Sequence, residues 1–305
     1  MTGVLTGFGT IAAVIALGFV LAQFKLIDES GQQTLTRLAF FVAMPCLLLS
    51  VISRTPVADV LSRPLAATFG GVLLAGLPYL VVARWVWHRR ADEVAIGTLC
   101  SAYCNAGNLG IPVAAYVLGD AALVAPMLLL NLVVLQPLAL AVLDAGRSGR
   151  ASLAGVLKSP LTNPLTIATF TGVVFSAAGW RLPLFVLNPV ELVGGMAVPA
   201  VLIAYGASLR LGPPPGRGTP PIELAFIATL KLAVQPVGAY LAGSALGLSG
   251  PALLALAVTA ALPSAQNIFV HAHRFGVGQV LARNAILVTT IGSVPAIAII
   301  TLLLT

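Results

Sequence analysis

The chain has 305 residues, of which 59% are hydrophobic and only 8% are charged, and its formal net charge is +7. A soluble domain of this length would have almost no charge to solvate its surface, so this composition excludes a soluble enzyme or binding module. Apolar runs of about 18 residues or more, each long enough to cross a hydrocarbon core of ~30 Å, recur along the chain. The sequence predicts an all-α polytopic membrane protein embedded in a lipid bilayer. Its basic residues are expected to orient it there, not to bind nucleic acid.

Ten membrane spans are expected when the chain is divided at charges, prolines and loop residues. The first begins near Val4, has full spanning length and follows no basic n-region, so we interpret it as a membrane helix and not as a cleaved signal. The predicted spans are 4–24, 36–53, 64–87, 94–118, 121–143, 160–179, 189–209, 222–246, 251–273 and 281–304.

Basic residues are concentrated in the loops on one side of these spans. That side has Lys25, Arg37, Arg84, Arg89, Arg90, Arg147, Arg150, Lys158, Arg210, Arg217, Arg274 and Arg283. The other side has Arg54, Arg63 and Arg181. The excess of positive charge marks the cytoplasmic side. We therefore expect a plasma-membrane protein whose N- and C-termini are both extracytoplasmic.

The two halves of the chain resemble each other. "FVAMPCLLLS" in the second span resembles "GMAVPAVLIAYG" in the seventh, and at a nearly constant offset Pro78 matches Pro236 and Pro137 matches Pro295. The same offset aligns "NAGNLGIP" of the fourth span with "PSAQNIFV" of the ninth. Because five spans is an odd number, the second copy is inverted, as in many secondary transporters. The predicted division is a first repeat over 1–146, a cytoplasmic connector over 147–158 and an inverted repeat over 159–305.

Polar residues interrupt the fourth and ninth spans, where they are costly in lipid. Pro112 and Pro263 each free the carbonyl four residues earlier, and Gly107 and Gly110 weaken the helix around Pro112, so these four residues are the expected helix breaks. Broken helix is tolerated in a membrane only where it is buried or lines a wet cavity. The amides that flank the breaks can donate to a carboxylate, so we predict a substrate site made by Asn105, Asn108, Gln266 and Asn267. The alternative is that these amides bond across helices as packing contacts, which is the role we expect for Asn131, Gln136 and Asn163.

Lys231 is the one basic residue well inside a predicted span. It could supply positive charge to an anionic substrate, pair with Asp144 or Glu223, or extend to the cytoplasmic interface. We include it among the predicted substrate-binding residues.

The remaining reactive side chains are assigned to packing or to the interface. Cys46, Cys100 and Cys104 fall in apolar spans and are expected to pack there, not to hold a metal. His271 and His273 lie where the ninth span reaches the cytoplasm, so interfacial placement is favoured over a proton relay. No cofactor or metal is expected.

Five segments together resemble the auxin efflux carrier family, which includes bacterial permeases and the plant PIN-formed carriers. They are "NAGNLGIPVA", "TNPLTIATFTGVV", "MAVPAVLIAYGASL", "LKLAVQP" and "LPSAQNIFVHAHRFG". The resemblance implies a five-plus-five architecture similar to that of bile-acid/sodium symporters, in which broken spans four and nine cross at the substrate site. It also implies an elevator-like movement of spans three to five and eight to ten against spans one, two, six and seven.

The same resemblance implies that Asn105 or Asn108 holds an organic carboxylate, since plant members use an asparagine beside the crossover and bacterial members are described as malonate or other organic-acid permeases. The long regulatory loop of many plant members is absent here.

These observations favour a secondary carrier that moves a mono- or dicarboxylate, and uniport in the direction of efflux is the expected mode. Three alternatives remain open: a sodium- or proton-coupled symporter, a channel, and an intramembrane enzyme using Cys104, His271 or His273. A second copy of the chain, in a homodimer, is a further candidate partner.

Overall fold

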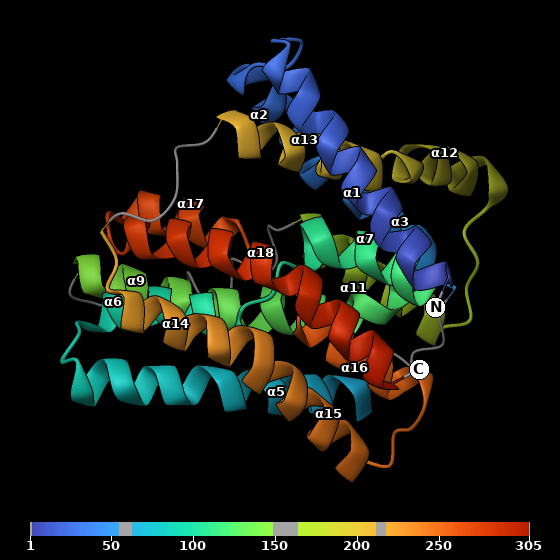
Figure 1. Cartoon of the computed structure of the whole chain (residues 1–305). Helices are drawn as coiled ribbons and strands as arrows, with labels where there is room; N and C mark the ends of the chain where they lie inside the picture. Colours follow the sequence, from blue (N-terminus) through green and yellow to red (C-terminus); the bar gives the residue numbers. More distant parts are fainter. Residues whose placement is uncertain (1, 55–62, 149–163, 212–217, 305) are drawn as a thin grey trace. The chain divides into compact units, whose positions relative to one another are not determined.

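The computed structural model describes residues 2–54, 63–148, 164–211 and 218–304. Within these ranges all regular secondary structure is helical (Figure 1). Five continuous helical segments are long and apolar enough to cross a membrane: Glu29–Ile52, Arg63–Val86, Leu184–Leu211, Pro221–Ala245 and Gln279–Leu304. The all-helical class is therefore confirmed for the described residues, while ten spans, an inverted repeat and the orientation of the termini stay predictions. Most of the predicted connector, residues 149–158, lies outside the described ranges.

The helices form two compact units, each built from both halves of the chain. Unit 1 contains residues 1–60, 107–125 and 162–214, and unit 2 contains residues 61–106, 126–161 and 215–305. The chain therefore passes between units within the predicted fourth span, between Ala106 and Gly107.

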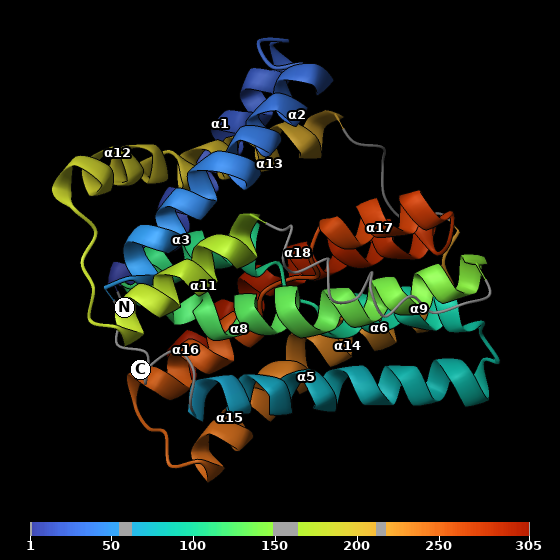
Figure 2. The ribbon, with the colours of Figure 1, turned by 180° about the vertical axis from the view of Figure 1, so that it is seen from behind.

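Unit 1 consists of the helices α1 (Thr2–Gln23), α2 (Glu29–Leu38), α3 (Met44–Ile52), α7 (Ile111–Val113), α11 (Pro164–Ala177), α12 (Leu184–Gly195) and α13 (Ala197–Leu211). Helix α1 packs along α13, and α3 contacts α11 and α12 (Figure 2). At the start of α2 the Asp28 side chain accepts a hydrogen bond from the Gly31 N–H at 2.7 Å, which caps the helix.

Unit 2 consists of α5 (Arg63–Val81), α6 (Ala91–Ala102), α8 (Ala125–Leu129), α9 (Gln136–Ser148), α14 (Pro221–Thr229), α15 (Gln235–Ala245), α16 (Pro251–Ala260), α17 (Asn267–Phe275) and α18 (Gln279–Leu304). The first residue of α8, Ala125, belongs to unit 1. Helix α5 packs along α15 and also contacts α6, while α16 contacts α15 and α18 (Figure 2).

Short π-helical turns precede several of the prolines that the sequence placed inside spans. The turns Ala39–Ala43, Ala106–Gly110 and Leu230–Val234 come directly before the segments that contain Pro45, Pro112 and Pro236. Proline removes one N–H and crowds the preceding turn, and a locally widened turn accommodates both effects without ending the helix.

Candidate functional site

Two helices of unit 2 end in the middle of the predicted fourth and ninth spans. Helix α6 ends at Ala102, and helical structure resumes at Ala106. Helix α16 ends at Ala260, and α17 begins at Asn267. The predicted spans are thus not continuous rods, and each leaves backbone groups that its own helix does not satisfy.

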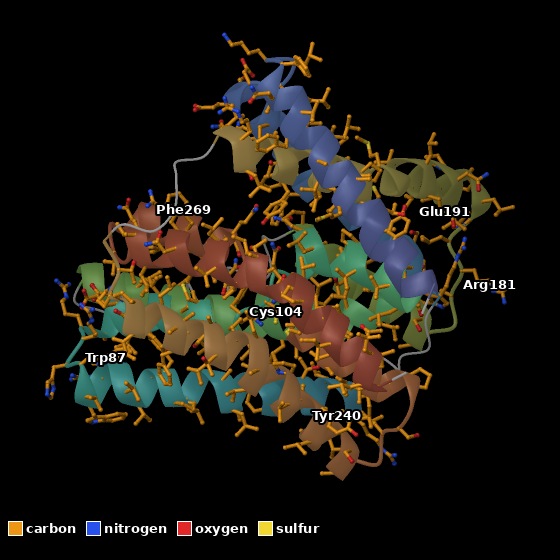
Figure 3. All side chains as sticks on the ribbon, viewed as in Figure 1. Trp87, Cys104, Arg181, Glu191, Tyr240 and Phe269 are labelled. Carbon is orange, nitrogen blue, oxygen red and sulfur yellow. The ribbon has the colours of Figure 1, made fainter. Side chains whose placement is uncertain are left out.

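The two interrupted segments pair with each other in antiparallel fashion around Cys104 and Ser264. The position of Cys104 is labelled in Figure 3. The pairing is made by backbone hydrogen bonds from the Asn105 N–H to the Pro263 oxygen (2.7 Å) and from the Ala265 N–H to the Tyr103 oxygen (3.2 Å). We call residues 103–105 and 263–265 the crossover. Its backbone groups exchange hydrogen bonds as two strands do, which satisfies them in the apolar interior.

Buried side chains hold the crossover from both sides. The Ser264 hydroxyl donates to the Cys100 carbonyl at 2.5 Å, and the Ser264 N–H donates to the Thr289 hydroxyl of α18 at 3.1 Å. The Asn131 amide donates to the Cys104 carbonyl at 2.8 Å. Asn131 was expected to act as a packing contact, and this bond is of that kind, although its partner is the crossover itself.

A polar cluster lies at the start of α17. The Tyr103 hydroxyl donates to Gln136 Oε1 at 3.0 Å, and the Asn267 amide donates to the Tyr103 oxygen at 3.1 Å and to Gln136 Oε1 at 3.3 Å. Gln136 and Asn267 are half-buried, whereas Tyr103 is buried. The cluster thus brings two amides and a hydroxyl together, and both amide side chains are only partly covered.

Lys231 lies next to the crossover and has no exposed surface. Its Nζ donates to Gln235 Oε1 at 2.6 Å, to the Ala260 carbonyl at 2.9 Å and to Cys104 Sγ at 2.9 Å. Lys231 therefore does not extend to the cytoplasmic interface. Among the described residues, no carboxylate forms an ion pair with it.

The carboxylate considered as a Lys231 partner is engaged elsewhere. Glu223 accepts hydrogen bonds from the Tyr79 hydroxyl (2.8 Å) and from Arg89 Nη2 (3.0 Å), which ties α14 to α5 and to the residues before α6. The other considered partner, Asp144, has a side chain that lies outside the described set.

The predicted substrate residues are divided between the units. Asn105, Gln266, Asn267 and Lys231 belong to unit 2, where Asn105 is buried in the crossover and Gln266 and Asn267 lie half-buried just after it. Asn108 belongs to unit 1 and lies in the π-helical turn Ala106–Gly110. Four of the five predicted binding residues therefore fall in one compact unit.

The helix interruption lies earlier in the fourth span than the sequence indicated. Gly107, Gly110 and Pro112 fall in helical turns over residues 106–118, after the extended residues of the crossover. Pro263 lies in the interruption itself. The difference arises because the π-helical turn absorbs Pro112, as described above, while the crossover pairing stabilises the break at residues 103–105.

Tyr103, Gln136 and Gln235 were not among the predicted site residues. Gln235 lies four residues after Lys231, on the same face of a helix, and this spacing was a usable signal. No comparable signal indicated the meeting of Tyr103 with Gln136, which depends on the fold. The three cysteines have free thiols, and in the described part of the chain no three His, Cys, Asp or Glu side chains form a metal-binding group.

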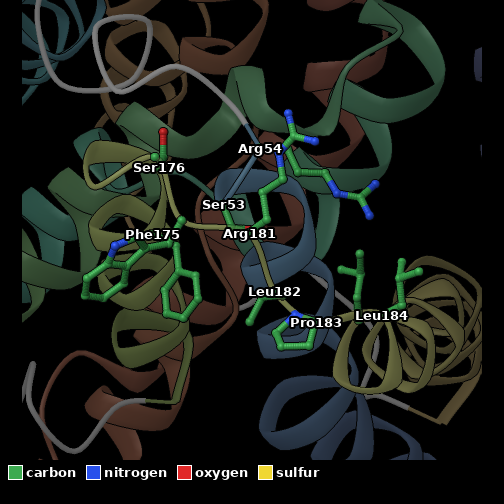
Figure 4. Close-up of a pocket in the computed structure, with 11 residues that line it drawn as sticks. Ser53, Arg54, Phe175, Ser176, Arg181, Leu182, Pro183 and Leu184 are labelled. Carbon is green, nitrogen blue, oxygen red and sulfur yellow. The ribbon is translucent and has the colours of Figure 1, made fainter.

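Unit 1 contains a separate pocket of about 870 Å³ (Figure 4). Arg54, Trp180 and Arg181 line it together with Phe175 and Pro183. Arg54 Nη2 is 2.7 Å from Glu191 Oε1, and both side chains of this ion pair are largely exposed. The residues lining this pocket do not include any of the predicted amides.

Comparison with known proteins identifies the family to which this chain belongs. A family model described as "Membrane transport protein" matches residues 8–154 and 144–301, which is almost the whole chain. The resemblance to auxin efflux carriers, inferred above from five motifs, is thereby confirmed at the level of the family.

Two relatives are similar over long stretches. A protein of Rhizobium meliloti described as "Putative malonate transporter" is 29% identical over 295 residues, which cover 93% of this chain and 90% of the relative. A protein of Methanothermobacter thermautotrophicus described as "Uncharacterized transporter" is 26% identical over 207 residues, which cover 66% of each.

Proposed function

The chain belongs to the membrane transport protein family, and on that premise we propose that it is a secondary carrier for a small organic anion, with malonate as the first substrate to test. The observation that carries the proposal is the crossover, where two interrupted helices pair in the interior of one unit. Irregular backbone at membrane depth is a feature of substrate sites in secondary transporters.

The chemistry around the crossover favours an anion. Asn105, Gln266 and Asn267 carry amide donors, and the Tyr103 hydroxyl is a further donor beside them. Helix α17 begins at Asn267, so the positive end of its dipole faces this region. We propose that the substrate carboxylate binds here in exchange for the bonds that Asn267 makes to Tyr103 and Gln136.

The division into two units supports an elevator-type cycle. The resemblance to auxin efflux carriers implies that spans three to five and eight to ten move against the others, and unit 2 contains most of those residues. One departure is that residues 107–125 cluster with unit 1. We propose that the hinge of the movement lies between Ala106 and Gly107, where the chain passes from one unit to the other.

We further propose ten spans in a five-plus-five inverted repeat, extracytoplasmic termini and a plasma-membrane location. Transport is proposed to be uniport in the direction of efflux, because export of an anion from a negative interior is favourable by ~2.3 kcal/mol per charge per 100 mV.

Asn267→Ala tests the site. The variant removes both amide bonds to the polar cluster and a donor to the substrate, so we expect malonate flux into proteoliposomes to fall by about tenfold or more. Gln33→Ala, which removes an exposed amide on α2, is the matched control and keeps full flux.

The readout is saturable uptake that is stimulated by unlabelled malonate inside the vesicle. Normal kinetics in both Asn267→Ala and Asn105→Ala would refute the site. Conductance that does not saturate would instead indicate a channel.

A further inference from the structure

The C-terminal ends of two helices of unit 2 lie close together, beside the side chains of Lys231 and Gln235. Helix α6 ends at Ala102, whose carbonyl accepts a hydrogen bond from Gln235 Nε2 at 2.9 Å. Helix α16 ends at Ala260, whose carbonyl accepts from Lys231 Nζ at 2.9 Å. Each helix C-terminus carries roughly half a negative charge, so about one negative charge accumulates under the crossover, away from water. A cation placed there would be stabilised by both helix ends.

The Lys231 side chain supplies such a cation, and its donors match the acceptors in number and in geometry. An ammonium group has three N–H donors, and Nζ has three acceptors, which are Gln235 Oε1, the Ala260 carbonyl and Cys104 Sγ. All three donors are therefore used inside the protein, and none remains for a substrate. This alters the role that the sequence suggested, because a hydrogen bond from Lys231 to a substrate would require the loss of one of these three bonds.

The contacts of Lys231 also join three chain segments. Lys231 and Gln235 lie on adjacent turns of the α14–α15 helix, and Cys104 lies in the first half of the crossover. Ala260 is the last residue of α16, which leads into the second half. Gln235 Nε2 reaches Cys104 Sγ as well, at 3.5 Å. A bound metal cation with backbone carbonyl ligands would hold the ends of two interrupted helices in the same way.

We propose that the Lys231 ammonium is the resident cation of the crossover, occupying the place that a coupling sodium ion would otherwise fill. The inference rests on the proposed carrier function and specifies its coupling. Because the ammonium already supplies the positive charge at the crossover, anion transport by the wild-type chain requires no metal cation. It also makes Lys231 a positioning residue, since it holds Cys104 and Ala260 and does not touch the substrate.

Removal of the ammonium tests the proposal without reference to transport. In Lys231→Ala the Gln235 Oε1, the Ala260 carbonyl and the Cys104 sulfur each lose the hydrogen bond from Nζ, and a cavity opens, so we expect thermal unfolding of the purified chain to shift down by several degrees. Propylammonium, which supplies both the charge and three N–H donors, is expected to restore most of the shift. Tetramethylammonium, which has no N–H, is not expected to do so. Lys25→Ala removes an exposed lysine from unit 1 and is the matched control, with no shift in any salt.

Two further measurements keep the test decisive if Lys231→Ala does not fold. Wild-type malonate flux and thermal stability are expected to be equal in sodium, potassium and choline chloride, and Lys231→Arg, which keeps the charge, is expected to retain this independence. Specific stabilisation or activation of the wild type by sodium would overturn the proposal. So would a Lys231→Met protein as stable and active as the wild type, or rescue of Lys231→Ala by tetramethylammonium as effective as by propylammonium. If the wild type moves no carboxylate in any salt, the carrier function fails, while the thermal comparison still decides the role of Lys231.

Discussion

The two units bury different kinds of side chain. Among the described residues of unit 1, the buried polar side chains are Ser50 and Thr169. Unit 2 buries charged groups and amides, and these are Asp92, Asn105, Asn131, Glu223, Lys231, Gln235 and Asn284. Buried charges and amides are stable only with partners, and in unit 2 the interrupted helices and neighbouring side chains supply them. The difference favours unit 2 as the location of the proposed substrate site.

Unit 1 gains its close packing from small residues. A Cβ added at Gly206 of α13 would overlap the carbonyl oxygen of Ile15, and one added at Gly18 of α1 would overlap that of Ile203. The two helices therefore approach until their backbones touch, as helices in membranes do where small residues face each other. Glycine in this unit thus has a packing role.

Gly206→Ala is expected to have the largest effect on stability. Its methyl group meets backbone and not a flexible side chain, so α1 and α13 must separate, at a cost of about 3 kcal/mol or more. Thermal unfolding and the yield of folded protein in detergent measure it. Gly195→Ala in α12 is the matched control, because beyond its chain neighbours and its own helix backbone no atom lies within 4 Å of the added Cβ. Equal stability of the two variants would show that unit 1 does not depend on this contact.

The sequence predicted the class of fold and the family, because both depend on local properties. Apolar runs of spanning length identify a helical membrane protein, and the five motifs identify its relatives. The order of the polar residues also indicated that the fourth and ninth spans are interrupted, and the structure has helix ends in both.

What the sequence could not give is the position of the first interruption and the partners of the buried groups. Pro112 is a strong local signal for a break, yet helix continues through it, while the break at residues 103–105 has no proline and depends on pairing with a distant segment. Lys231 likewise pairs with Cys104 and Ala260, which are close only in the folded chain. Such contacts are long-range by nature, and periodicity carries no information on them.

Tyr103→Phe is expected to have an intermediate effect, on half-saturation for malonate. It tests whether the proposed substrate site lies in unit 2. The variant removes one hydroxyl, which bonds Gln136 and Asn267, and keeps the ring. A hydrogen bond of this kind contributes about 0.5–1.5 kcal/mol, so half-saturation for malonate should rise roughly threefold to tenfold. Concentration-dependent uptake in proteoliposomes measures this, with Tyr116→Phe, a half-exposed tyrosine of unit 1, as the control. A larger effect at Tyr116 than at Tyr103 would reverse the comparison between the units.

Arg54→Ala is expected to have the smallest effect, although it breaks an ion pair of 2.7 Å with Glu191 beside the pocket of unit 1. The two side chains are 57% and 43% exposed, and water and salt screen a pair of this kind to about 0–1 kcal/mol. Thermal unfolding should change little, and whatever change occurs should shrink as salt is raised. Malonate flux should be unchanged, because the arginine belongs to the unit without buried charge. Loss of flux in folded Arg54→Ala protein would mean that the substrate also depends on unit 1, and the division of roles between the units would fail.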